Sequence, residues 1–591
     1  MTPMLLKSPR FDRPRLSAIW RFILCFGLGL CVALLGGCTL PKVDSAAKAQ
    51  EVLVNNVLPK LEIRTSEITD QVASRYTIDQ IQEPLPKVND FPLYGAQPSG
   101  NANEVYIEIY SSSEKANADR QNERWLIEVA DAFNSRGETV SGKPIKVGIR
   151  KIPSGTVARL LLAKSAQPTG YSPSNDLWTE MIKSQGVVIR PIVRRLVPNT
   201  AGLVLPGTVY DQLAAGGEVT FDRIVDQVAA GTLAVGYPNP YTSSTALNML
   251  YTLFWRAAGH QQDGGALTIA DVNSPQVNSV FEQFQQGVLA TTTTTLDLQE
   301  LFLRDSSVLQ AFPLEYQNYV NLKAVAGFEN TQFVPFGIIH NNPLVGFDWN
   351  TPEQRAALKK FADFATSPAM QNLAAQQGFM ATDYLKQGKT PPIPAGDVLL
   401  AAQSNWKLRK DAGRTAYMAI VVDTSGSMEG APLRAVQEGL RVASQYINPG
   451  NQVSLITFSD QPVQQLSLRP FDEQQHKRFL AAVDLLQSGG GTALYDGVMV
   501  GLSELLAQRQ KDPNGNYYLL LLSDGQTNIG YKFKEIKDIL AYSGVRFYPI
   551  AYGEVDEAEM QAIAELREST VKMGTPENVQ DLFRDLFQVN L

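Results

Sequence analysis

Cysteine and histidine are scarce in this chain of 591 residues, and their scarcity excludes several kinds of site. The three cysteines, Cys25, Cys31 and Cys38, all lie near the N-terminus. The rest of the chain can therefore form neither an intrachain disulfide nor a zinc site with cysteine ligands. The three histidines are widely separated in the sequence, which argues against a histidine-rich metal centre.

An excess of positive charge is absent too. The formal net charge is −7 and the isoelectric point is near 5.4. No large basic field is available to collect phosphates, so no nucleic-acid partner is expected. The chain also lacks a Gly-x-Ser-x-Gly motif, a His-Glu-x-x-His motif and, beyond residue 38, any cysteine nucleophile. These absences favour a protein that binds other molecules over an enzyme.

The N-terminal region has the layout of a bacterial export signal. Basic residues between Lys7 and Arg21 precede an uncharged run, Phe22 to Leu35, which is short for a membrane span. The next residues, Gly36-Gly37-Cys38, complete a sequence that resembles the lipobox of bacterial lipoproteins, which implies lipidation of Cys38. The alternative is a short transmembrane anchor with an incidental cysteine. Both interpretations place the remaining chain outside the cytoplasm, attached to a membrane and facing the periplasm or the cell surface.

The middle of the chain alternates predicted strands with predicted helices, which is the pattern of a parallel sheet. Three of these strands deliver small hydroxyl residues to a loop or a helix start, at Ser111–Ser113, Ser154–Thr156 and Thr242–Thr245. Helix N-termini offer free N–H groups and partial positive charge, and hydroxyls add neutral donors. Together they can hold an anion or a polar solute. The alternative is that each group is only a helix N-cap, which needs one Ser or Thr.

Residues from about 104 to 385 resemble the bacterial extracellular solute-binding proteins of the two-lobed periplasmic type. The matching stretches are Ser154–Thr156 with its helix, Tyr171–Trp178, Asn239–Thr245, Phe312–Tyr319 and the helices from Thr351 to Phe379. The resemblance implies two α/β lobes that close around a small ligand by a hinge. The candidate ligand-binding residues are Ser111, Ser112, Gly155, Thr156, Ser174, Thr242, Ser243, Ser244, Thr245 and Glu315.

A second alternation of strands and helices begins at about residue 413. Asp423, Ser425 and Ser427 follow a predicted buried strand at alternate positions, so their side chains can share a face. Asp524 follows another strand, and Thr492 comes from a glycine-rich loop between them. The carboxyl ends of the strands form the ligand edge of a doubly wound sheet. Two carboxylates with three hydroxyls suit a hard divalent ion, Mg²⁺ or Mn²⁺. The alternative is a set of independent helix caps and a turn.

These five residues closely resemble the signature of the von Willebrand factor A domain: an Asp-x-Ser-x-Ser loop, a distant Thr and a distant Asp. In that family the set is called the metal-ion-dependent adhesion site, or MIDAS. The resemblance covers residues from about 413 to 591. It implies a doubly wound parallel sheet and a metal ion whose coordination is completed by a carboxylate of a protein partner.

We therefore expect an α/β protein with five parts. They are a lipoprotein signal peptide (1–37), a spacer (38–100), a two-lobed solute-binding-like module (101–387), a linker (388–412) and a Rossmann-like von Willebrand factor A domain (413–591). The expected function is metal-dependent protein–protein interaction by a membrane-anchored extracytoplasmic binding protein, with a small solute or anion as a second ligand. The alternative is the ligand-capturing subunit of an ABC-type importer, in which the C-terminal domain serves only for docking.

Overall fold

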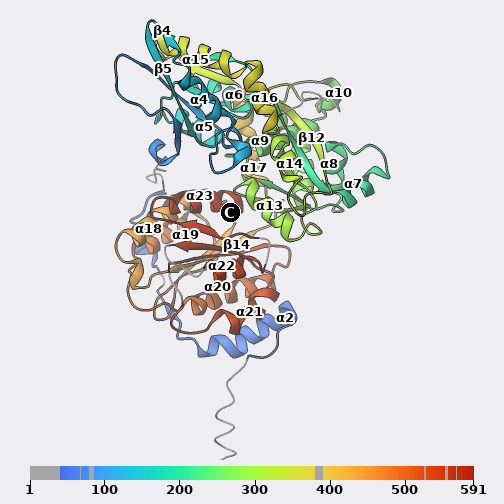
Figure 1. Cartoon of the computed structure of the whole chain (residues 1–591). Helices are drawn as coiled ribbons and strands as arrows, with labels where there is room; N and C mark the ends of the chain where they lie inside the picture. The colour runs from blue at the N-terminus through green and yellow to red at the C-terminus, as the bar shows by residue number, and fades with distance from the viewer. Residues whose placement is uncertain are drawn as a thin grey trace, which may run out of the picture.

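The chain forms two α/β bodies, which lie one above the other in Figure 1. The computed structural model describes residues 40–66, 68–78, 85–379, 390–524, 527–552, 557–566 and 569–591. The upper body in the figure contains the middle module, and the lower body contains the C-terminal domain. The expected α/β class, with a module of several sheets before a domain built on one mostly parallel sheet, is confirmed.

The first lobe of the middle module is a sheet flanked by helices. Its strands are β2 (Leu93–Gly95), β3 (Val105–Ser111), β4 (Thr139–Val140), β5 (Lys143–Lys151), β6 (Gly170–Ser172), β7 (Ile189–Val193) and β13 (Leu344–Phe347), and its helices are α4 (Trp125–Ser135), α5 (Ser154–Leu162), α6 (Asp176–Ser184), α15 (Pro352–Ala365) and α16 (Pro368–Gln376). The strand order is β2-β5-β3-β6-β13-β7, and β3 pairs in parallel with β5 and β6. The sheet is not parallel throughout. β13 is antiparallel to both neighbours because the chain re-enters this lobe after building the second one.

The second lobe surrounds one almost fully buried helix. Its strands are β8 (Asn199–Pro206), β9 (Val235–Pro238), β10 (Val288–Thr292), β11 (Phe312–Glu315) and β12 (Thr331–His340), and its helices are α7 (Gly207–Ala214), α8 (Phe221–Ala229), α9 (Ser244–Ala257), α10 (His260–Asp263), α11 (Ile269–Val272), α12 (Pro275–Gln286), α13 (Thr295–Arg304) and α14 (Tyr316–Leu322). Every residue of α9 except Arg256 is buried. The N-terminus of α9 is capped by Ser243, whose side chain accepts a hydrogen bond from Ala246 N–H.

The C-terminal domain is a doubly wound sheet. Its strands are β14 (Ala416–Asp423), β15 (Gln452–Phe458), β16 (Pro462–Pro470), β17 (Asn516–Ser523), β18 (Arg546–Tyr552) and β19 (Lys572–Gly574), and its helices are α18 (Ala431–Ala443), α19 (Glu473–Asp484), α20 (Leu494–Arg509), α21 (Phe533–Tyr542), α22 (Glu557–Ala564) and α23 (Val579–Asn590). All of β14 is buried, because α20, α21 and α22 cover one face of the sheet and α18, α19 and α23 cover the other. β16 forms an antiparallel hairpin with β15, which the sequence reading does not include.

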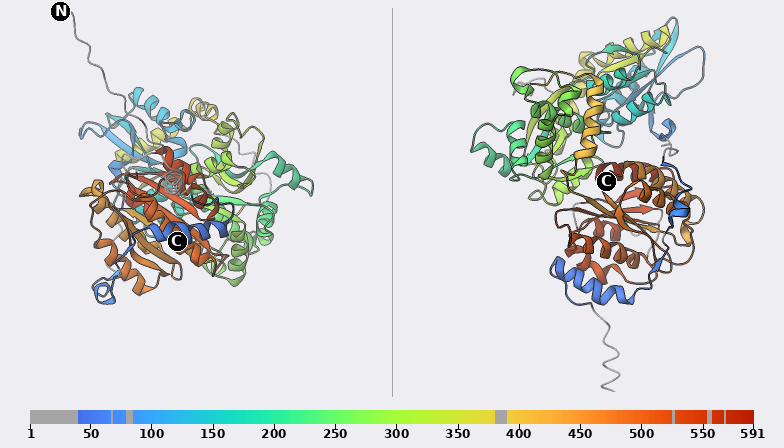
Figure 2. Two further views of the ribbon diagram at one scale, coloured as in Figure 1. Left: turned by 90° about the horizontal axis from the view of Figure 1, so that it is seen from below. Right: turned by 180° about the vertical axis from the view of Figure 1, so that it is seen from behind.

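The N-terminal segment packs on this C-terminal domain. α2 (Ala46–Val52) continues as a π-helical turn, Leu53–Val57, and buries apolar side chains in the core that α20 and α21 also line. β1 (Arg64–Thr65) extends the sheet beside β16. The back view in Figure 2 shows this segment along the lower body. Much of the stretch expected to be a spacer is therefore a layer of the C-terminal domain.

The expected linker, 388–412, contains a helix, α17 (Gly396–Arg409). It packs on α6, α9 and α11 of the middle module. Trp406 is buried, and its Nε1–H donates a 2.8 Å hydrogen bond to the hydroxyl of Tyr237. The helical part of this stretch therefore belongs to the core of the middle module.

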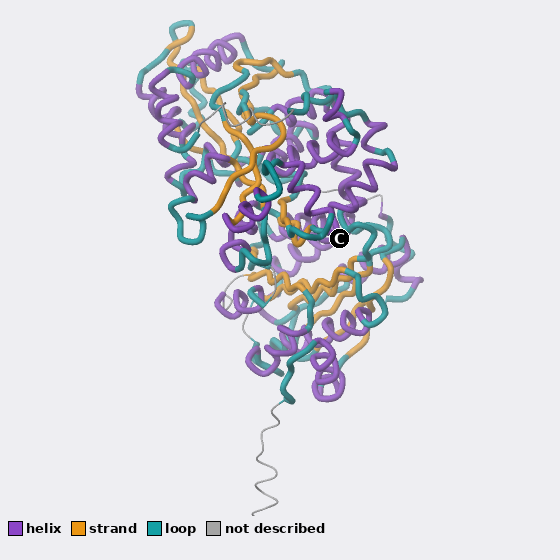
Figure 3. The backbone as a smooth tube through the Cα atoms, turned by 90° about the vertical axis from the view of Figure 1, so that its right-hand side faces the viewer, coloured by secondary structure: helices purple, strands orange, loops and turns teal. Residues whose placement is uncertain are grey.

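The two bodies meet near the C-terminus of the chain (Figure 3), where helix α23 of the C-terminal domain packs on β10 of the second lobe. Lys572 on β19 forms an ion pair with Asp297 on α13, and only 9% of the Asp297 side chain is exposed. Lys407 Nζ donates to the backbone oxygen of Gln588 at 2.9 Å. These buried polar contacts fix α23 against the middle module.

Candidate functional site

Four of the five predicted metal-binding residues form one connected group at the carboxyl edge of the C-terminal sheet. The Oγ atoms of Ser425 and Ser427 lie 3.0 Å apart, and the Ser427 hydroxyl donates to Asp524 Oδ1 at 2.8 Å. Asp423 Oδ1 accepts from the backbone N–H of Ser425 at 2.8 Å. Asp423 and Ser425 are buried, whereas Ser427 is exposed, so the group opens to solvent on one side.

The fifth residue, Thr492, is brought to this edge by its loop. Two backbone hydrogen bonds join the loop to the Asp423 turn: Gly489 N–H donates to Thr424 O at 2.9 Å, and Gly426 N–H donates to Gly490 O at 3.1 Å. Gly490 has a φ of 82°, a left-handed conformation in which glycine is favoured. The glycine-rich sequence thus allows the tight turn that holds buried Thr492 beside the aspartate loop.

The surroundings of Asp423 and Asp524 disfavour the charged form of both carboxylates. Burial raises the pKa of Asp423, with hydrogen bonds from Ser425 and Ser523 opposing the shift and the charge of Asp524 adding to it. Burial also raises the pKa of Asp524, against the hydrogen bond from Ser427. Raised pKa values mean that the surroundings disfavour the two negative charges, which a bound cation would compensate.

The donor set fits a small hard cation. Adjacent oxygens around an octahedral ion with bonds of about 2.1 Å lie about 3.0 Å apart, close to the 2.8 and 3.0 Å spacings seen here. Among the described residues, no group of three or more His, Cys, Asp or Glu side chains is placed to hold a metal ion. A metal at this edge would therefore depend on the two carboxylates acting together with hydroxyls and water, the ligands that Mg²⁺ prefers.

A second candidate site is a cavity of about 420 Å³ in the middle module. Eight of the ten predicted ligand-binding residues line it: Ser112, Thr156, Ser174, Thr242, Ser243, Ser244, Thr245 and Glu315. The other two do not. Ser111 is buried in β3, and Gly155 packs so tightly that an added Cβ would lie 2.1 Å from Tyr241 O. Gly155 is therefore explained by close packing of α5 against the loop before α9.

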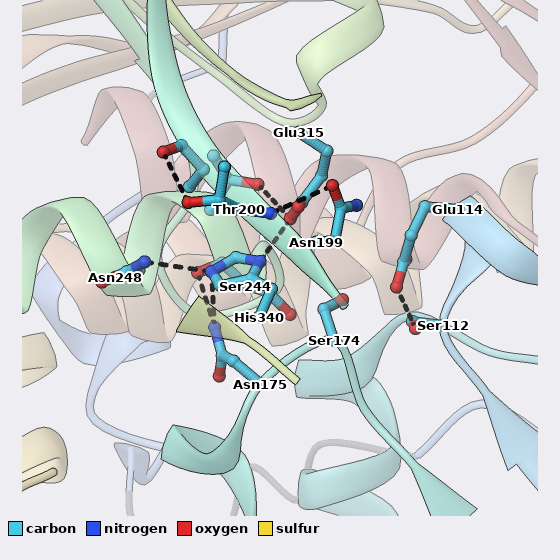
Figure 4. Close-up of polar contacts among 12 residues, drawn as sticks. Ser112, Glu114, Ser174, Asn175, Asn199, Thr200, Ser244, Asn248, Glu315 and His340 are labelled. Atoms are coloured by element: carbon cyan, nitrogen blue, oxygen red, sulfur yellow. Dashed lines mark hydrogen bonds and ion pairs between the residues drawn. The ribbon is translucent and has the colours of Figure 1, made fainter. Parts of the chain in front are cut away.

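A buried polar network around His340 adjoins this cavity through Glu315, which lines it (Figure 4). The Nδ2 atoms of Asn175 and Asn248 lie 3.1 and 3.0 Å from His340 Nε2. Both amides are oriented by the backbone, because their oxygens accept from Leu177 N–H and Ile338 N–H respectively. Nε2 must then accept hydrogen bonds, so the proton of the neutral ring is on Nδ1.

That proton is directed at Glu315, whose Oε1 lies 2.6 Å from His340 Nδ1. Oε1 also accepts from Thr245 Oγ1 at 3.1 Å. The second carboxylate oxygen, Oε2, is buried and has no hydrogen-bond partner among the described residues. Glu315 lines the cavity, so an unsatisfied acceptor in its carboxylate indicates a place for a ligand donor once the side chain turns toward it.

Some of the predicted ligand hydroxyls already have structural contacts. Ser243 caps α9, and Ser244 Oγ accepts a 2.9 Å hydrogen bond from Trp178 Nε1. The N-cap alternative thus holds for Ser243. Within the described parts of the chain, Thr242 Oγ1 makes one long hydrogen bond, 3.4 Å, to Asn239 O.

The structure adds functional candidates that the sequence reading missed. Lys115 is fully buried behind the cavity, where it contacts Ser112 and donates to Asn342 Oδ1 at 2.9 Å. Arg584 and Asp585 of α23 line the cavity although they belong to the C-terminal domain. A lysine after a predicted strand is a weak signal, and the contribution of α23 has no local signal in the sequence.

Cys38 and the expected signal peptide lie outside the described residues. Within the described parts of the chain, no helix is long and apolar enough to cross a membrane.

Comparisons with known proteins identify both modules. The family model described as von Willebrand factor type A domain matches residues 418–585, and the one described as bacterial extracellular solute-binding protein matches residues 120–380. Inter-alpha-trypsin inhibitor heavy chain H4 of Homo sapiens is 29% identical over 117 residues, which are 19% of this chain and 13% of that protein. An uncharacterized protein of Synechocystis sp. is 23% identical over 175 residues, 29% of this chain and 40% of that protein. The match thus spans less than half the length of each relative.

Solved structures resemble each module separately. Iron-bound HitA from Pseudomonas aeruginosa is 16% identical with a TM-score of 0.37, covering 52% of this chain and 99% of its own. A periplasmic thiamin binding protein is 14% identical with a TM-score of 0.37, covering 53% and 98%. A von Willebrand factor type A protein from Catenulispora acidiphila is 20% identical with a TM-score of 0.27, covering 30% and 42%. The two family matches show that the chain contains a bacterial extracellular solute-binding domain followed by a von Willebrand factor type A domain. Both were expected from the sequence motifs.

Proposed function

We propose that this protein is an exported binding protein, lipid-anchored at Cys38, that captures an acidic protein partner through a divalent metal ion. Asp423, Ser425, Ser427, Thr492 and Asp524 would hold Mg²⁺ or Mn²⁺, and a partner carboxylate would complete its coordination. The observation that carries the proposal is the chain of oxygens from Ser425 through Ser427 to Asp524, spaced as ligands of one small ion and open to solvent at Ser427.

The test is calorimetric titration of Mn²⁺ and Mg²⁺ into the chelator-treated protein. Wild type should bind one ion, and Asp423→Ala should bind none in the same concentration range. Asp538→Ala is the matched control, because Asp538 is an exposed carboxylate on α21, outside the group. Equal metal affinity in Asp423→Ala and wild type would refute the site. Capture of the partner in the presence of chelator would refute its role in binding.

We infer a second binding activity, for a small solute, in the cavity of the middle module. The observation that favours it is the buried, unpartnered Oε2 of Glu315 in a cavity of about 420 Å³. This volume is in the range of small-molecule sites. A solute that donates a hydrogen bond there, such as one with an ammonium or hydroxyl group, would satisfy the carboxylate. Arg120 and Lys151 in the same lining offer contacts for an anionic group of that solute.

The chain should therefore prefer a zwitterionic or hydroxylated solute over a simple anion. A thermal-shift panel of amino acids, sugars and inorganic anions tests this preference. A ligand at a hundredfold excess over its Kd stabilises the protein by about 2.7 kcal/mol. Glu315→Gln should weaken binding of solutes with a donor group. Stabilisation by sulfate alone, unchanged in Glu315→Gln, would contradict the assignment. A strong response to a free solute would also favour the importer-subunit alternative.

A further inference from the structure

A further cavity lies at neither candidate site. It has a volume of about 520 Å³ and lies where the two modules meet. From the C-terminal domain it is lined by the first residues of β17 and β18, and from the middle module by Gly231–Ala234 and Gln286–Thr291. It shares no lining residue with the cavity that contains Glu315. The metal-site residues lie at the opposite edge of the same sheet, about 25 Å away along the eight residues of β14.

The lining of this interdomain cavity is strongly basic, although the whole chain is acidic. Its charged residues are Lys410, Asp411, Arg414, Arg509 and Arg546. Lys410 Nζ lies 2.7 Å from Asp411 Oδ2, so these two charges compensate each other. The guanidinium groups of Arg414, Arg509 and Arg546 also line the cavity, in a chain whose formal net charge is −7.

The contacts of two of these arginines leave their charge without a neutralising partner. Arg414 Nε donates to the backbone oxygen of Asp411 at 3.1 Å, and Arg509 donates to the backbone oxygen of Ser543 at 2.5 Å. These acceptors are uncharged, and no ion pair of Arg414 or Arg509 occurs among the residues that the structure describes. A guanidinium has five N–H donors, and these contacts use only one or two of them. Both side chains thus keep donors and charge for a ligand.

The cavity also has aromatic surface. Tyr517 and Tyr518 are part of the lining, and the guanidinium carbon of Arg546 lies 6.0 Å from the centre of the Tyr518 ring. Gly544 lies against Arg509, and a Cβ at Gly544 would lie 1.8 Å from Arg509 Nη1, so glycine leaves the space that this guanidinium occupies. The fold therefore holds these arginines around the interdomain cavity, and they are not dispersed on an open surface.

We propose that this interdomain cavity binds a small organic polyanion with at least two phosphate or carboxylate groups. The planar fork of arginine matches both groups in a bidentate manner, and the two separate guanidinium groups of Arg414 and Arg509 favour a ligand with more than one negative charge. A volume of about 520 Å³ accommodates an organic body as well as its charged groups. The ligand touches both modules, so its binding stabilises their association. The proposal is independent of the metal ion and of the solute in the other cavity.

The experiment uses the full chain in chelator, which empties the metal site and keeps Mg²⁺ from complexing the probe. Pyrophosphate and citrate are titrated by calorimetry and thermal shift, and these two probes distinguish phosphate from carboxylate chemistry. Arg414→Gln/Arg509→Gln removes two positive charges from the interdomain cavity. Arg120→Gln/Lys151→Gln removes two positive charges from the lining of the other cavity and reports any binding there. The matched control is Lys359→Gln/Lys537→Gln, which removes two exposed positive charges on α15 and α21, outside both cavities.

We expect at least one probe to bind wild type and the control double variant, and to bind Arg414→Gln/Arg509→Gln at least about tenfold more weakly, a change of about 1.4 kcal/mol. Loss of binding in Arg120→Gln/Lys151→Gln with retention in Arg414→Gln/Arg509→Gln would place the anion in the other cavity and overturn the proposal. So would the absence of any response in wild type at about 10 mM probe, well above ordinary ligand affinities.

Hydrogen exchange of the wild-type protein keeps the proposal testable if the arginine double variant does not fold. The bound probe should slow exchange at residues 231–234, 286–291 and 516–518, which line the cavity from both modules. Protection confined to the segments around Ser112 and Glu315 would overturn the assignment.

Discussion

The side-chain amide of Asn239 donates a 2.7 Å hydrogen bond to Oε1 of Gln588, 349 residues further along the chain. Both side chains are buried. Asn239 begins the loop that leads into Thr242 and Ser243, which line the cavity that contains Glu315 (here called the solute cavity). Gln588 lies one turn after Arg584 on α23. This single bond therefore connects the solute cavity of one module with the last helix of the other.

We predict that Asn239→Ala and Gln588→Ala each destabilise the protein by about 1–3 kcal/mol, because each leaves a buried polar group without its partner. The double variant should be less destabilised than the sum of the two, with a coupling energy of about 0.5–3 kcal/mol. Urea unfolding of the four proteins measures this. Gln561→Ala, on α22 outside the interface, is the control. Strict additivity would mean that the bond contributes nothing to the junction of the modules.

Asp423→Asn should separate folding from metal binding. In chelator we expect its free energy of unfolding to equal or exceed that of wild type, because a buried negative charge near Asp524 is removed. Addition of Mg²⁺ should raise the melting temperature of wild type and leave that of the variant unchanged. A large loss of stability in chelator would show instead that this carboxylate is required for the fold.

Acid should destabilise the C-terminal domain through His476. Burial lowers the pKa of His476 from 6.5 to about 4, and its Nε2 lies 2.7 Å from Ser444 Oγ. Because the folded-state pKa is the lower one, the unfolded chain binds more protons between these values. Stability is then lost as the pH falls from about 6.5 toward 4, by at most about 1.4 kcal/mol per pH unit.

His476→Gln should reduce this loss, as measured by chemical unfolding at pH 7, 6 and 5. His260 provides a control of opposite sign. Partial burial lowers the pKa of His260, but hydrogen bonds to Asp271 and Asp263 outweigh it, so the net shift is upward. The stability that His260 contributes is therefore present at low pH and lost as the pH rises. If His476→Gln and His260→Gln changed the pH profile in the same direction, this assignment would be wrong.

The protonation of His340 can be observed directly, because the chain has only three histidines. The amides of Asn175 and Asn248 both point their nitrogens at Nε2, so we expect the tautomer with hydrogen on Nδ1. Nitrogen NMR of histidine-labelled protein distinguishes the two tautomers, with His340→Gln identifying the resonance. A proton on Nε2 would contradict the network around Glu315.

The sequence was informative where a site is built from strand ends. Asp423, Ser425 and Asp524 could be placed together because parallel strands end at a common edge, which depends on local pattern alone. Lys115 and His340 could not be recognised, because their burial results from contacts with Asn342 and Glu315 that only the complete fold creates.

Contacts between modules were beyond sequence reasoning for the same reason. The periodicity of α23 predicts a helix with one apolar face, but not that Arg584 and Asp585 meet the solute cavity. The stretch after Cys38 has helical periodicity followed by several prolines, and nothing local indicates that α2 packs on α20 and α21.

The packing of α2 has a mechanical consequence. Val43 is buried in the C-terminal domain and Leu40 packs against the same core, so a lipid on Cys38 would be attached only two residues before the part of the chain that contacts this domain. α2 lies on the side of this domain away from the middle module (Figures 1 and 2). A protein tethered in this way stands with its von Willebrand domain next to the bilayer and its solute cavity held a full domain above it. A permease in the same membrane would then meet the von Willebrand domain first.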